Sequence, residues 1–363
     1  MSKDQAKGKP KDINELLKTI EKDFGSGSLM RGRGKMVDVE VFPTNIAGID
    51  FALGAGGIPL GRIIELYGAE SSGKTTTCLS IVAACQKHFF PNKKRKGVAA
   101  IIDAEHALDP RWTEKIGVDM ENLIISQPDS GEQGFQILER LVDSEMVDLI
   151  VVDSVAALVP LAMLEGEITD ANVGAQARLM SKGLNKIKGK CNRTSTTVIF
   201  INQIREKIGV MFGNPEQTPG GRALKFYSTI RAEVRKGSSI KVGDTVVGFR
   251  PTIKMVKNKV AAPFMQGSFD ICFGLAERPV YGIDAVGSLI DLATEHNILK
   301  KNGSFFVYNE IRLGNGINNA SQALRENQTL RDEIRNKLYD QFGQLEKIQQ
   351  TEEPEDGDDE SEV

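Results

Sequence analysis

Cysteine, histidine and long apolar runs are scarce in this chain of 363 residues. Its four cysteines form no C-x-x-C pair and do not cluster with the three histidines. This spacing indicates neither a zinc site nor a disulfide framework. No apolar run approaches the roughly 20 residues that span a bilayer, and the N-terminal residues lack the apolar core of a signal peptide. We therefore expect a cytoplasmic protein with no membrane segment.

Charge is unevenly distributed along the chain. The formal net charge is −3, but the last thirteen residues, TEEPEDGDDESEV, hold eight acidic residues and no basic one. The rest of the chain is therefore mildly basic. A basic body with an acidic tail is typical of nucleic-acid binders, because the tail competes with phosphate for the basic surface. The alternative is a solvated, disordered terminus without a role.

A glycine-rich segment at residues 62–76, RIIELYGAESSGKTT, joins an apolar strand to a helix. It contains the phosphate-binding motif Gly68-x-x-x-x-Gly73-Lys74-Thr75 in the strand-to-helix context that this motif requires. The two glycines let backbone N–H groups point inward, and the helix adds its positive dipole end. Lys74 would lie against the β- and γ-phosphates, and the Thr75 hydroxyl would bind Mg²⁺. The sequence predicts a nucleoside triphosphate site.

Three further apolar runs end in polar residues: GVAAIIDAE, VDLIVVDS and TTVIFINQ. Strands that alternate with helices predict a mainly parallel sheet covered on both faces, with ligands at the strands' carboxyl ends. Asp153 fits the Walker B aspartate that orders Mg²⁺ together with Thr75, and Glu105 fits the general base for hydrolysis. Trp112 either stacks on adenine or fills the core.

Residues 12–25 predict an amphipathic helix, which Asp12 caps and Gly25 ends. Its apolar stripe docks either on its own core or on a neighbouring subunit, through a Gly/Arg-rich tether. Farther along, the run Lys93–Lys96 predicts a surface loop, with its charges either solvated or in contact with DNA. Beyond Phe273, two helical segments (residues 285–299 and 321–342) and a strand pair (305–308 with 310–313) predict a small α/β module.

Two long polar connections interrupt the strand pattern, and such loops in compact domains are usually functional or disordered. The first loop runs from Glu165 to Arg178, and the second runs from Gln203 to Arg222. The second combines basic residues with Phe212, which suits phosphate contacts plus an apolar wedge in single-stranded DNA. A nucleotide-gated lid is the alternative. Lys257 and Lys259 end a strand soon afterwards.

Long strings of this sequence resemble the bacterial RecA recombinase family, from about Ile13 to about Phe342: ALGAGGIPLGRIIELYGAESSGKTT, IIDAEHALDP, VVDSVAALVP, INQIREKIGVMFGNPEQTPGGRALKFYS and VKNKVAAPF. The resemblance implies an α/β fold, with a RecA-like P-loop ATPase core built on a mainly parallel twisted sheet. It also implies an N-terminal oligomerisation helix and tether (1–36), a core (37–273), a small C-terminal α/β domain (274–345) and a disordered acidic tail (346–363). The N-terminal helix would then pack on the adjacent protomer.

The same resemblance implies the function. It is ATP-dependent homologous recombination, in which a helical filament on single-stranded DNA pairs with homologous double-stranded DNA and exchanges strands. DNA-stimulated ATP hydrolysis, ATP and Mg²⁺ as cofactors, self-association and a place in DNA repair and the SOS response follow from it. A ring-forming helicase-type motor and a non-catalytic ATP-gated filament scaffold remain as rival classes.

Site residues also follow from the resemblance. Glu105 would activate water, Gln203 would sense the γ-phosphate, and Lys257 with Lys259 would reach the neighbouring subunit's ATP. The nucleotide site would comprise Gly68, Ala69, Glu70, Ser71, Ser72, Gly73, Lys74, Thr75, Thr76, Asp109 and Trp112, with Mg²⁺ on Thr75 and Asp153. The DNA-binding residues would be Glu165, Gly166, Asn172, Gly174, Arg178, Arg205, Lys207, Met211, Phe212, Asn214, Gly220, Gly221 and Arg222.

The sequence departs from the family pattern at a few positions. Trp112 replaces the usual tyrosine, and the segment HFFPNKKRK lengthens the connection that follows the P-loop helix. In the second loop, Glu206 stands at a usually apolar position, and Pro219 and Arg222 also differ. These differences bear on loop dynamics and DNA affinity rather than on the reaction class.

Overall fold

A computed structural model describes residues 12–25, 39–167, 174–206, 216–276 and 278–351. Contacts divide the chain into two units, Met1–Glu40 and Val41–Val363. The first contains helix α1 (Ile13–Phe24), in which Asp12 accepts a hydrogen bond from the Glu15 backbone N–H at 2.8 Å and Gly25 forms the C-cap. The predicted helix and both of its caps are confirmed.

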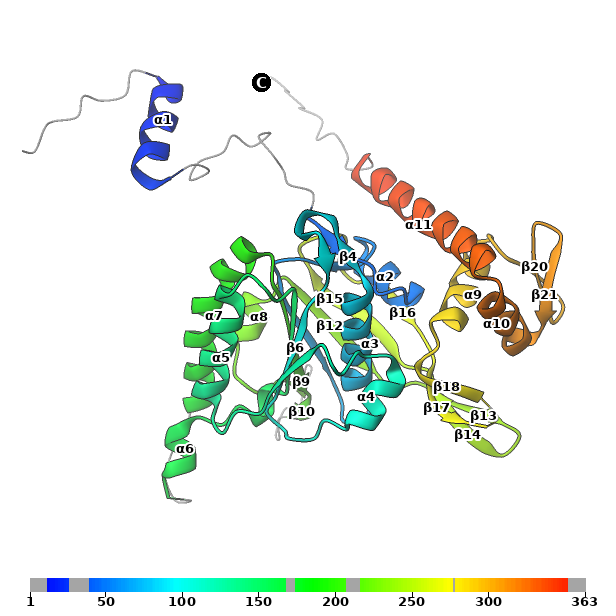
Figure 1. Cartoon of the computed structure of the whole chain (residues 1–363), viewed down its shortest axis with the longest axis horizontal. Helices are drawn as coiled ribbons and strands as arrows, with labels where there is room; N and C mark the ends of the chain where they lie inside the picture. Colours follow the sequence, from blue (N-terminus) through cyan, green and yellow to red (C-terminus); the bar gives the residue numbers. More distant parts are fainter. Residues whose placement is uncertain (1–11, 26–38, 168–173, 207–215, 277, 352–363) are drawn as a thin grey trace, which may run out of the picture. The chain divides into compact units, whose positions relative to one another are not determined.

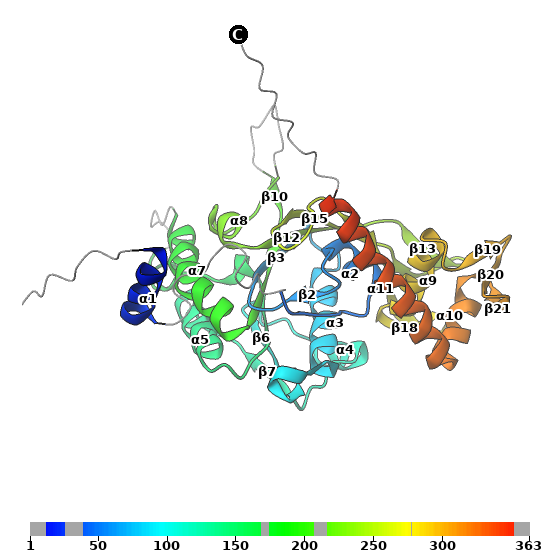
Figure 2. The ribbon, with the colours of Figure 1, turned by 90° about the horizontal axis from the view of Figure 1, so that it is seen from above.

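An eight-stranded sheet forms the centre of the second unit (Figures 1 and 2). Six strands are parallel, and the last two at one edge, β15 and β16, are antiparallel. The predicted mainly parallel sheet is confirmed. In spatial order the strands are β16 (Gln266–Ser268), β15 (Thr252–Asn258), β12 (Ile230–Arg235), β3 (Ile63–Gly68), β9 (Thr197–Gln203), β8 (Leu149–Asp153), β6 (Ala99–Asp103) and β7 (Leu123–Ser126).

Helices cover both faces of this sheet (Figure 1). On one face lie α2 (Ala47–Leu53), α3 (Lys74–Lys87) and α4 (Pro110–Ile116); on the other lie α5 (Gly131–Asp143), α7 (Ala175–Thr194) and α8 (Ala223–Tyr227). Side chains of the buried strands alternate between the two cores, so Leu149 and Val151 face α3 whereas Ile150 and Val152 face α5 and α7. We call these the α3 face and the α7 face.

Several elements were missed by the sequence analysis. Residues 47–53 form α2, which was not anticipated, and neither was β7. The short strand β1 (Val41–Phe42), which the sequence does indicate after Val37, pairs with β2 (Ile58–Pro59), which was missed. Within the second loop, β10 (Arg205–Glu206) pairs with β11 (Glu216–Gln217). Elements this short carry too little periodicity to be recognised from the sequence.

The C-terminal part contains two smaller antiparallel sheets and three helices. One sheet holds β13 (Ser239–Val242), β14 (Thr245–Phe249), β17 (Ile271–Leu275) and β18 (Arg278–Ile283), and the other holds β19 (Lys300–Asn302), β20 (Phe305–Tyr308) and β21 (Ile311–Asn315). A third core packs the second of these sheets against α9 (Ala285–Glu295), α10 (Gly316–Glu326) and α11 (Gln328–Thr351). The predicted strand pair is confirmed, as β20 with β21.

The helix expected at residues 321–342 is wrong as a single element. It is two helices that break at Asn327, whose side-chain oxygen accepts a hydrogen bond from the Leu330 backbone N–H at 3.0 Å. Asparagine favours such a capping position, so it starts a new helix there. Two expected domain limits fall inside elements of the structure: the limit at residues 273/274 lies within β17, and the limit at residues 345/346 lies within α11. The domain limits themselves stay predictions. Residues 352–363 of the tail lie outside the described residues.

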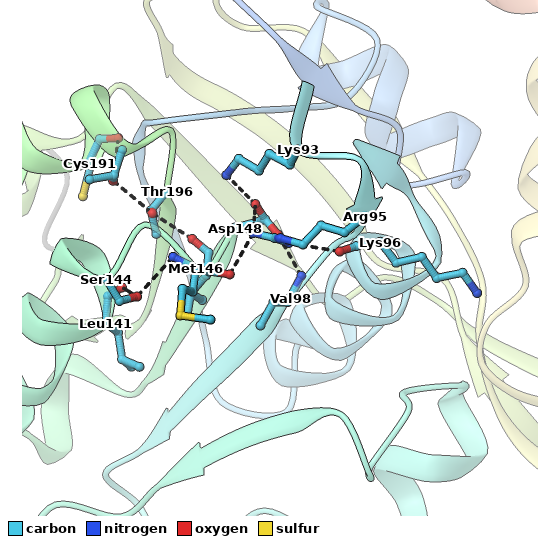
Figure 3. A network of polar contacts seen from close by, with 12 residues as sticks. Lys93, Arg95, Lys96, Val98, Leu141, Ser144, Met146, Asp148, Cys191 and Thr196 are labelled. Carbon is cyan, nitrogen blue, oxygen red and sulfur yellow. Dashed lines mark hydrogen bonds and ion pairs between the residues drawn. The ribbon is translucent and has the colours of Figure 1, made fainter. Parts of the chain in front are cut away.

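The basic run at residues 93–96 was expected to be a surface loop. It forms a hairpin of β4 (Phe89–Phe90), the 3-10 helix η1 (Pro91–Lys93) and β5 (Arg95–Lys96). Lys93 Nζ lies 2.6 Å from one oxygen of the fully buried Asp148 carboxylate, and an Arg95 guanidinium nitrogen lies 2.5 Å from the other (Figure 3). Lys93 and Arg95 are therefore ion-paired with Asp148 instead of freely solvated, whereas Lys94 and Lys96 are exposed, and a DNA contact of this run stays a prediction.

No helix in the described parts of the second unit, or in α1, is long and apolar enough to cross a membrane.

We predict that Asp148→Ala lowers the free energy of unfolding by about 2–4 kcal/mol, because it leaves two cations and the Val98 N–H without their buried acceptor. Urea unfolding followed by circular dichroism measures the change. The matched control is Asp143→Ala, which removes a half-exposed ion pair with Lys190 and should cost less than about 1 kcal/mol. Equal effects of the two substitutions would contradict a stabilising role for the buried contacts of Asp148.

Candidate nucleotide site and loop bases

The P-loop turn is shaped by two positions that tolerate only glycine. A Cβ atom at Gly68, where β3 ends, would lie 2.1 Å from the Val234 carbonyl oxygen. Gly73 has a φ of 96°, and a Cβ atom there would lie 2.4 Å from a methyl group of Ile271. The loop between them therefore keeps its backbone exposed at the start of α3, where N–H groups can surround an anion.

Lys74, the first residue of α3, is buried against this loop. Its ammonium nitrogen donates a hydrogen bond to the Ala69 carbonyl oxygen at 2.7 Å. Burial lowers the pKa of Lys74, while the carboxylates of Asp153 and Glu105 raise it. Among the described residues, the buried Ser72 hydroxyl of the same loop has no hydrogen-bond partner. An ammonium ion and an unpaired hydroxyl at a helix N-terminus fit a phosphate ligand.

Thr75 and Asp153 face each other across the head of α3 and the end of β8. The Thr75 hydroxyl donates a hydrogen bond to an Asp153 oxygen at 2.8 Å. The pKa of Asp153 is raised to about 6, chiefly by burial and also by the neighbouring Glu105 and Asp103 carboxylates, while the Thr75 hydrogen bond lowers it. Oxygen ligands in an acidic setting are the donor set that Mg²⁺ prefers, so these two residues fit the ion.

Glu105 lies beyond the end of β6 and is held by groups from two neighbouring strands. The buried Ser154 hydroxyl, just after β8, donates a hydrogen bond to Glu105 Oε1. The Gln203 amide nitrogen, at the end of β9, lies 3.5 Å from the same oxygen. The structure therefore brings together the three polar strand ends that the sequence predicted to converge.

Two supporting residues of this site were missed as functional. Ser154 orients Glu105, and Asp103 accepts hydrogen bonds from the backbone N–H groups of Ala107 and Leu108 at 3.3 and 3.2 Å. Asp103 thereby fixes the turn that carries Glu105. Their positions at strand ends were visible in the sequence, but their partners are set by the tertiary structure.

A cavity of about 80 Å³ opens beside these groups, and its lining includes Thr75, Cys78, Glu105, Leu108 and Asp153. Of the described residues, neither Asp109 nor Trp112 belongs to that lining. Asp109 instead caps α4 through the Trp112 N–H, and the half-buried Trp112 ring packs edge-on to Tyr281 at 6.2 Å. The structure thus favours the core interpretation of Trp112, and its contact with adenine stays a prediction.

The first loop is described only at its ends. Glu165 ends the short helix α6 (Leu161–Glu165), Gly166 follows it, and Gly174 adopts a φ of 75° before α7. Arg178 is exposed in the first turn of α7, which begins at Ala175. Residues 175–178, which were expected in the loop, therefore belong to the helix. Asn172 lies outside the described residues.

The second loop is likewise described at its two bases. Arg205 is exposed on β10, and Arg222 is exposed just before α8. Gly220 is buried, and a Cβ atom there would lie 2.9 Å from Val155, while one at Gly221 would lie 2.8 Å from Ala177. The loop's exit is therefore fixed against the α7 face. Lys207, Met211, Phe212 and Asn214 lie outside the described residues.

Lys257 and Lys259 lie at the end of β15, away from the cavity lining. Lys257 donates hydrogen bonds to the carbonyl oxygens of Lys225 and Ser228, at 2.9 and 2.7 Å, where α8 ends. Burial lowers its pKa, and the cations of Lys259 and Arg231 lower it further. Lys259 is exposed. Within one subunit, Lys257 therefore caps a helix C-terminus, an interaction that the helix dipole favours.

Comparisons with known proteins agree with this architecture. A family model described as the RecA N-terminal domain matches residues 11–276, and one described as the RecA C-terminal domain matches residues 287–343. The chain is 51% identical to Protein RecA of Clostridium tetani over 337 residues, covering 93% of each chain. It is 52% identical to Protein RecA of Clostridioides difficile over 339 residues, again covering 93% of each. With Protein RecA of Lactobacillus johnsonii it shares 50% identity over 358 residues, covering 98% of this chain and 95% of the relative.

These matches run through the P-loop, the three converging strand ends and both loops, and they extend over the C-terminal module. They favour the recombinase over a ring-forming motor or a non-catalytic scaffold. The chain therefore belongs to the RecA family, the DNA-dependent ATPases of homologous recombination and DNA repair.

Proposed function

We propose that residues 68–76 bind the phosphates of ATP and that Thr75 and Asp153 hold Mg²⁺ beside them. The observation that carries this proposal is the meeting of Thr75, Asp153, Glu105 and Gln203 at one edge of the sheet, with hydrogen bonds or short distances joining them in pairs. When bound, the ion neutralises charge that develops on the transferred phosphoryl group. Lys74 exchanges its contact with the Ala69 carbonyl for a phosphate oxygen.

Glu105 acts as the general base in this proposal. Its exposed carboxylate, oriented by Ser154, takes a proton from the attacking water. Gln203 donates its amide toward the γ-phosphate and thereby reports occupancy of the site to the second loop that follows it. Hydrolysis removes that contact, so the second loop returns to the state with lower affinity for DNA.

The proposed DNA partners are a single strand and a homologous duplex. Exposed Arg178, Arg205 and Arg222, at the described bases of the two loops, supply positive charge for the DNA backbone. The proposed self-association is a helical filament, in which Lys257 and Lys259 act on the nucleotide of the neighbouring subunit. Helix α1, with Ile13, Leu16 and Phe24 exposed, supplies an apolar stripe for such an assembly.

The experiment that tests the whole proposal measures ATP hydrolysis with and without single-stranded DNA, alongside strand exchange with a homologous duplex. Stimulated hydrolysis together with homology-dependent exchange is the expected result. Stimulated hydrolysis without exchange, together with unwinding of a duplex, would instead indicate a translocating motor.

We predict that Thr75→Val lowers ATP turnover by about 100-fold at saturating ATP, because valine keeps the shape of threonine but cannot ligate Mg²⁺. Steady-state turnover across a Mg²⁺ titration measures this. Ser80→Ala is the matched control, since that hydroxyl lies farther along α3 and donates to the Thr76 carbonyl oxygen at 3.0 Å. Wild-type Mg²⁺ dependence in Thr75→Val would refute the metal assignment.

We predict that Glu105→Gln lowers turnover by about 10²–10⁴-fold while ATP and single-stranded DNA still bind, because an amide cannot accept the proton. Turnover assays and fluorescence anisotropy with labelled DNA separate the two effects. Glu114→Gln, at an exposed position on α4, is the control. Turnover within threefold of wild type in Glu105→Gln would assign the general base elsewhere.

We predict that the double variant Lys257→Ala/Lys259→Ala loses at least about 90% of its DNA-stimulated turnover, since the transition state loses cations supplied across the interface. Lys254→Ala, exposed on the same strand, is the control. Mixing the double variant with Lys74→Ala decides whether the lysines act in trans. About a quarter of the interfaces in an equal, random mixture then combine an intact P-loop with intact lysines and should hydrolyse ATP. A mixture as inactive as its components would contradict action in trans.

A further inference from the structure

A buried polar cluster includes Asn202, the residue just before Gln203, and lies on the face of the sheet opposite to the nucleotide cavity. Its members are Glu65 on β3, Asn202 on β9 and Arg231 on β12, three adjacent strands. Glu65 and Asn202 are fully buried. Because side chains alternate along β9, Ile201 lines the nucleotide cavity on the α3 face, whereas Asn202 points to the α7 face.

Asn202 uses its amide to join three separate parts of the chain. Its Nδ2 donates hydrogen bonds to Glu65 Oε1 at 3.0 Å and to the Pro219 carbonyl oxygen at 3.1 Å. Its Oδ1 accepts a hydrogen bond from the Gln203 backbone N–H at 3.0 Å. A primary amide supplies two donors and one acceptor group, so this side chain satisfies all three contacts at once.

Two of these contacts reach different parts of the fold. Glu65 is held by Arg231, whose Nε lies 2.5 Å from the second carboxylate oxygen and whose guanidinium stacks 4.7 Å from the centre of the Tyr67 ring. Pro219, in contrast, lies at the exit of the second loop, immediately before the buried Gly220. Asn202 therefore connects a fixed point inside the sheet with the end of the second loop.

We propose that Asn202 is the positioning residue that transmits the state of Gln203 to the exit of the second loop. Movement of Gln203 toward a γ-phosphate shifts its backbone N–H, and that N–H is bound to Asn202 Oδ1. The amide then moves relative to Glu65 and displaces the Pro219 carbonyl to which it is bonded. This inference rests on the proposed roles of Gln203 and the second loop, and it adds the link between them.

The cluster also extends toward the lysines that are proposed to act in trans. Arg231 pairs in register with Lys257 across β12 and β15, beside an irregularity in the ladder between Arg231 and Ala232. The Arg231 cation lowers the pKa of Lys257. One buried cluster thus contacts the strand before the P-loop, the strand that carries Gln203, the second loop and the strand that carries Lys257.

The test is the double variant Glu65→Gln/Asn202→Asp, which exchanges the amide and the carboxylate between two positions. The new Gln side chain can still donate to the new Asp side chain and accept from Arg231 Nε, and the cluster keeps one carboxylate, now at position 202. The Gln203 N–H also keeps an acceptor. Among the hydrogen bonds, the one to Pro219 is lost, because a carboxylate has no proton to donate to a carbonyl oxygen; the contact of Arg231 with position 65 becomes one to a neutral amide.

Anisotropy titrations give the affinity for single-stranded DNA with a non-hydrolysable ATP analogue and with ADP, and the ratio of the two measures coupling. We expect the exchange to reduce this ratio at least tenfold, a coupling loss of about 1.4 kcal/mol, while ATP affinity stays within threefold of wild type. Gln86→Glu is the matched control, because it also converts a buried amide that donates to a backbone carbonyl, that of Asp119 at 2.9 Å. It should leave the ratio unchanged.

Each outcome decides the inference. A wild-type ratio in the exchange variant would overturn it, because the bond to Pro219 would then be dispensable. Asn202→Ser, which leaves the Glu65–Arg231 pair intact, is the second variant, and the same loss of coupling is expected. If both variants melted more than about 15 °C below wild type, the cluster would serve only the sheet, which would also overturn the inference. If the wild-type protein itself showed no difference between nucleotides, the proposed function of Gln203 would fail first.

Discussion

The structure depends on parallel strands that end at one edge of the sheet and bring carboxylates together there. Asp153, Glu105 and the buried Asp103 lie close enough that their charges oppose the ionisation of Asp153, and burial raises its pKa to about 6. The nearby Lys74 is the reverse case, because burial lowers its pKa while the carboxylates of Asp153 and Glu105 raise it. Charges of both signs are thus placed side by side, an arrangement that suits a ligand with phosphates and a divalent cation.

Three polar side chains of the site have partners within the protein itself. Lys74 is bonded to the Ala69 carbonyl, Thr75 to Asp153, and Glu105 to Ser154. Ligand binding therefore exchanges hydrogen bonds instead of creating them, and the side chains need no ordering from a mobile state. Such preorganisation reduces the entropic cost of reaching the reactive geometry.

Local sequence patterns predicted the site, while contacts between distant residues decided what they missed. The P-loop, the buried strands and the α1 caps depend on neighbours within a few residues, so motif and periodicity were sufficient. Ion pairing of Lys93 and Arg95 depends on Asp148, more than 50 residues away, and read locally the run is only a cluster of charges. Asn202 is similar, because its function as a link requires Glu65 and Pro219 to be adjacent.

Two buried carboxylates, each paired with an arginine, hold different segments of this fold in place. Asp148 lies just before β8 and fixes the β4–β5 hairpin, while Glu65 lies within β3 and fixes Asn202. Replacing a buried ion pair with apolar residues is often neutral or stabilising, so stability alone explains neither pair. What apolar side chains cannot supply is direction, since the hydrogen bonds of a carboxylate with several donors fix both the distance and the angle of each donor. Glu65 therefore provides the fixed reference against which a small displacement at Gln203 can become a displacement at Pro219.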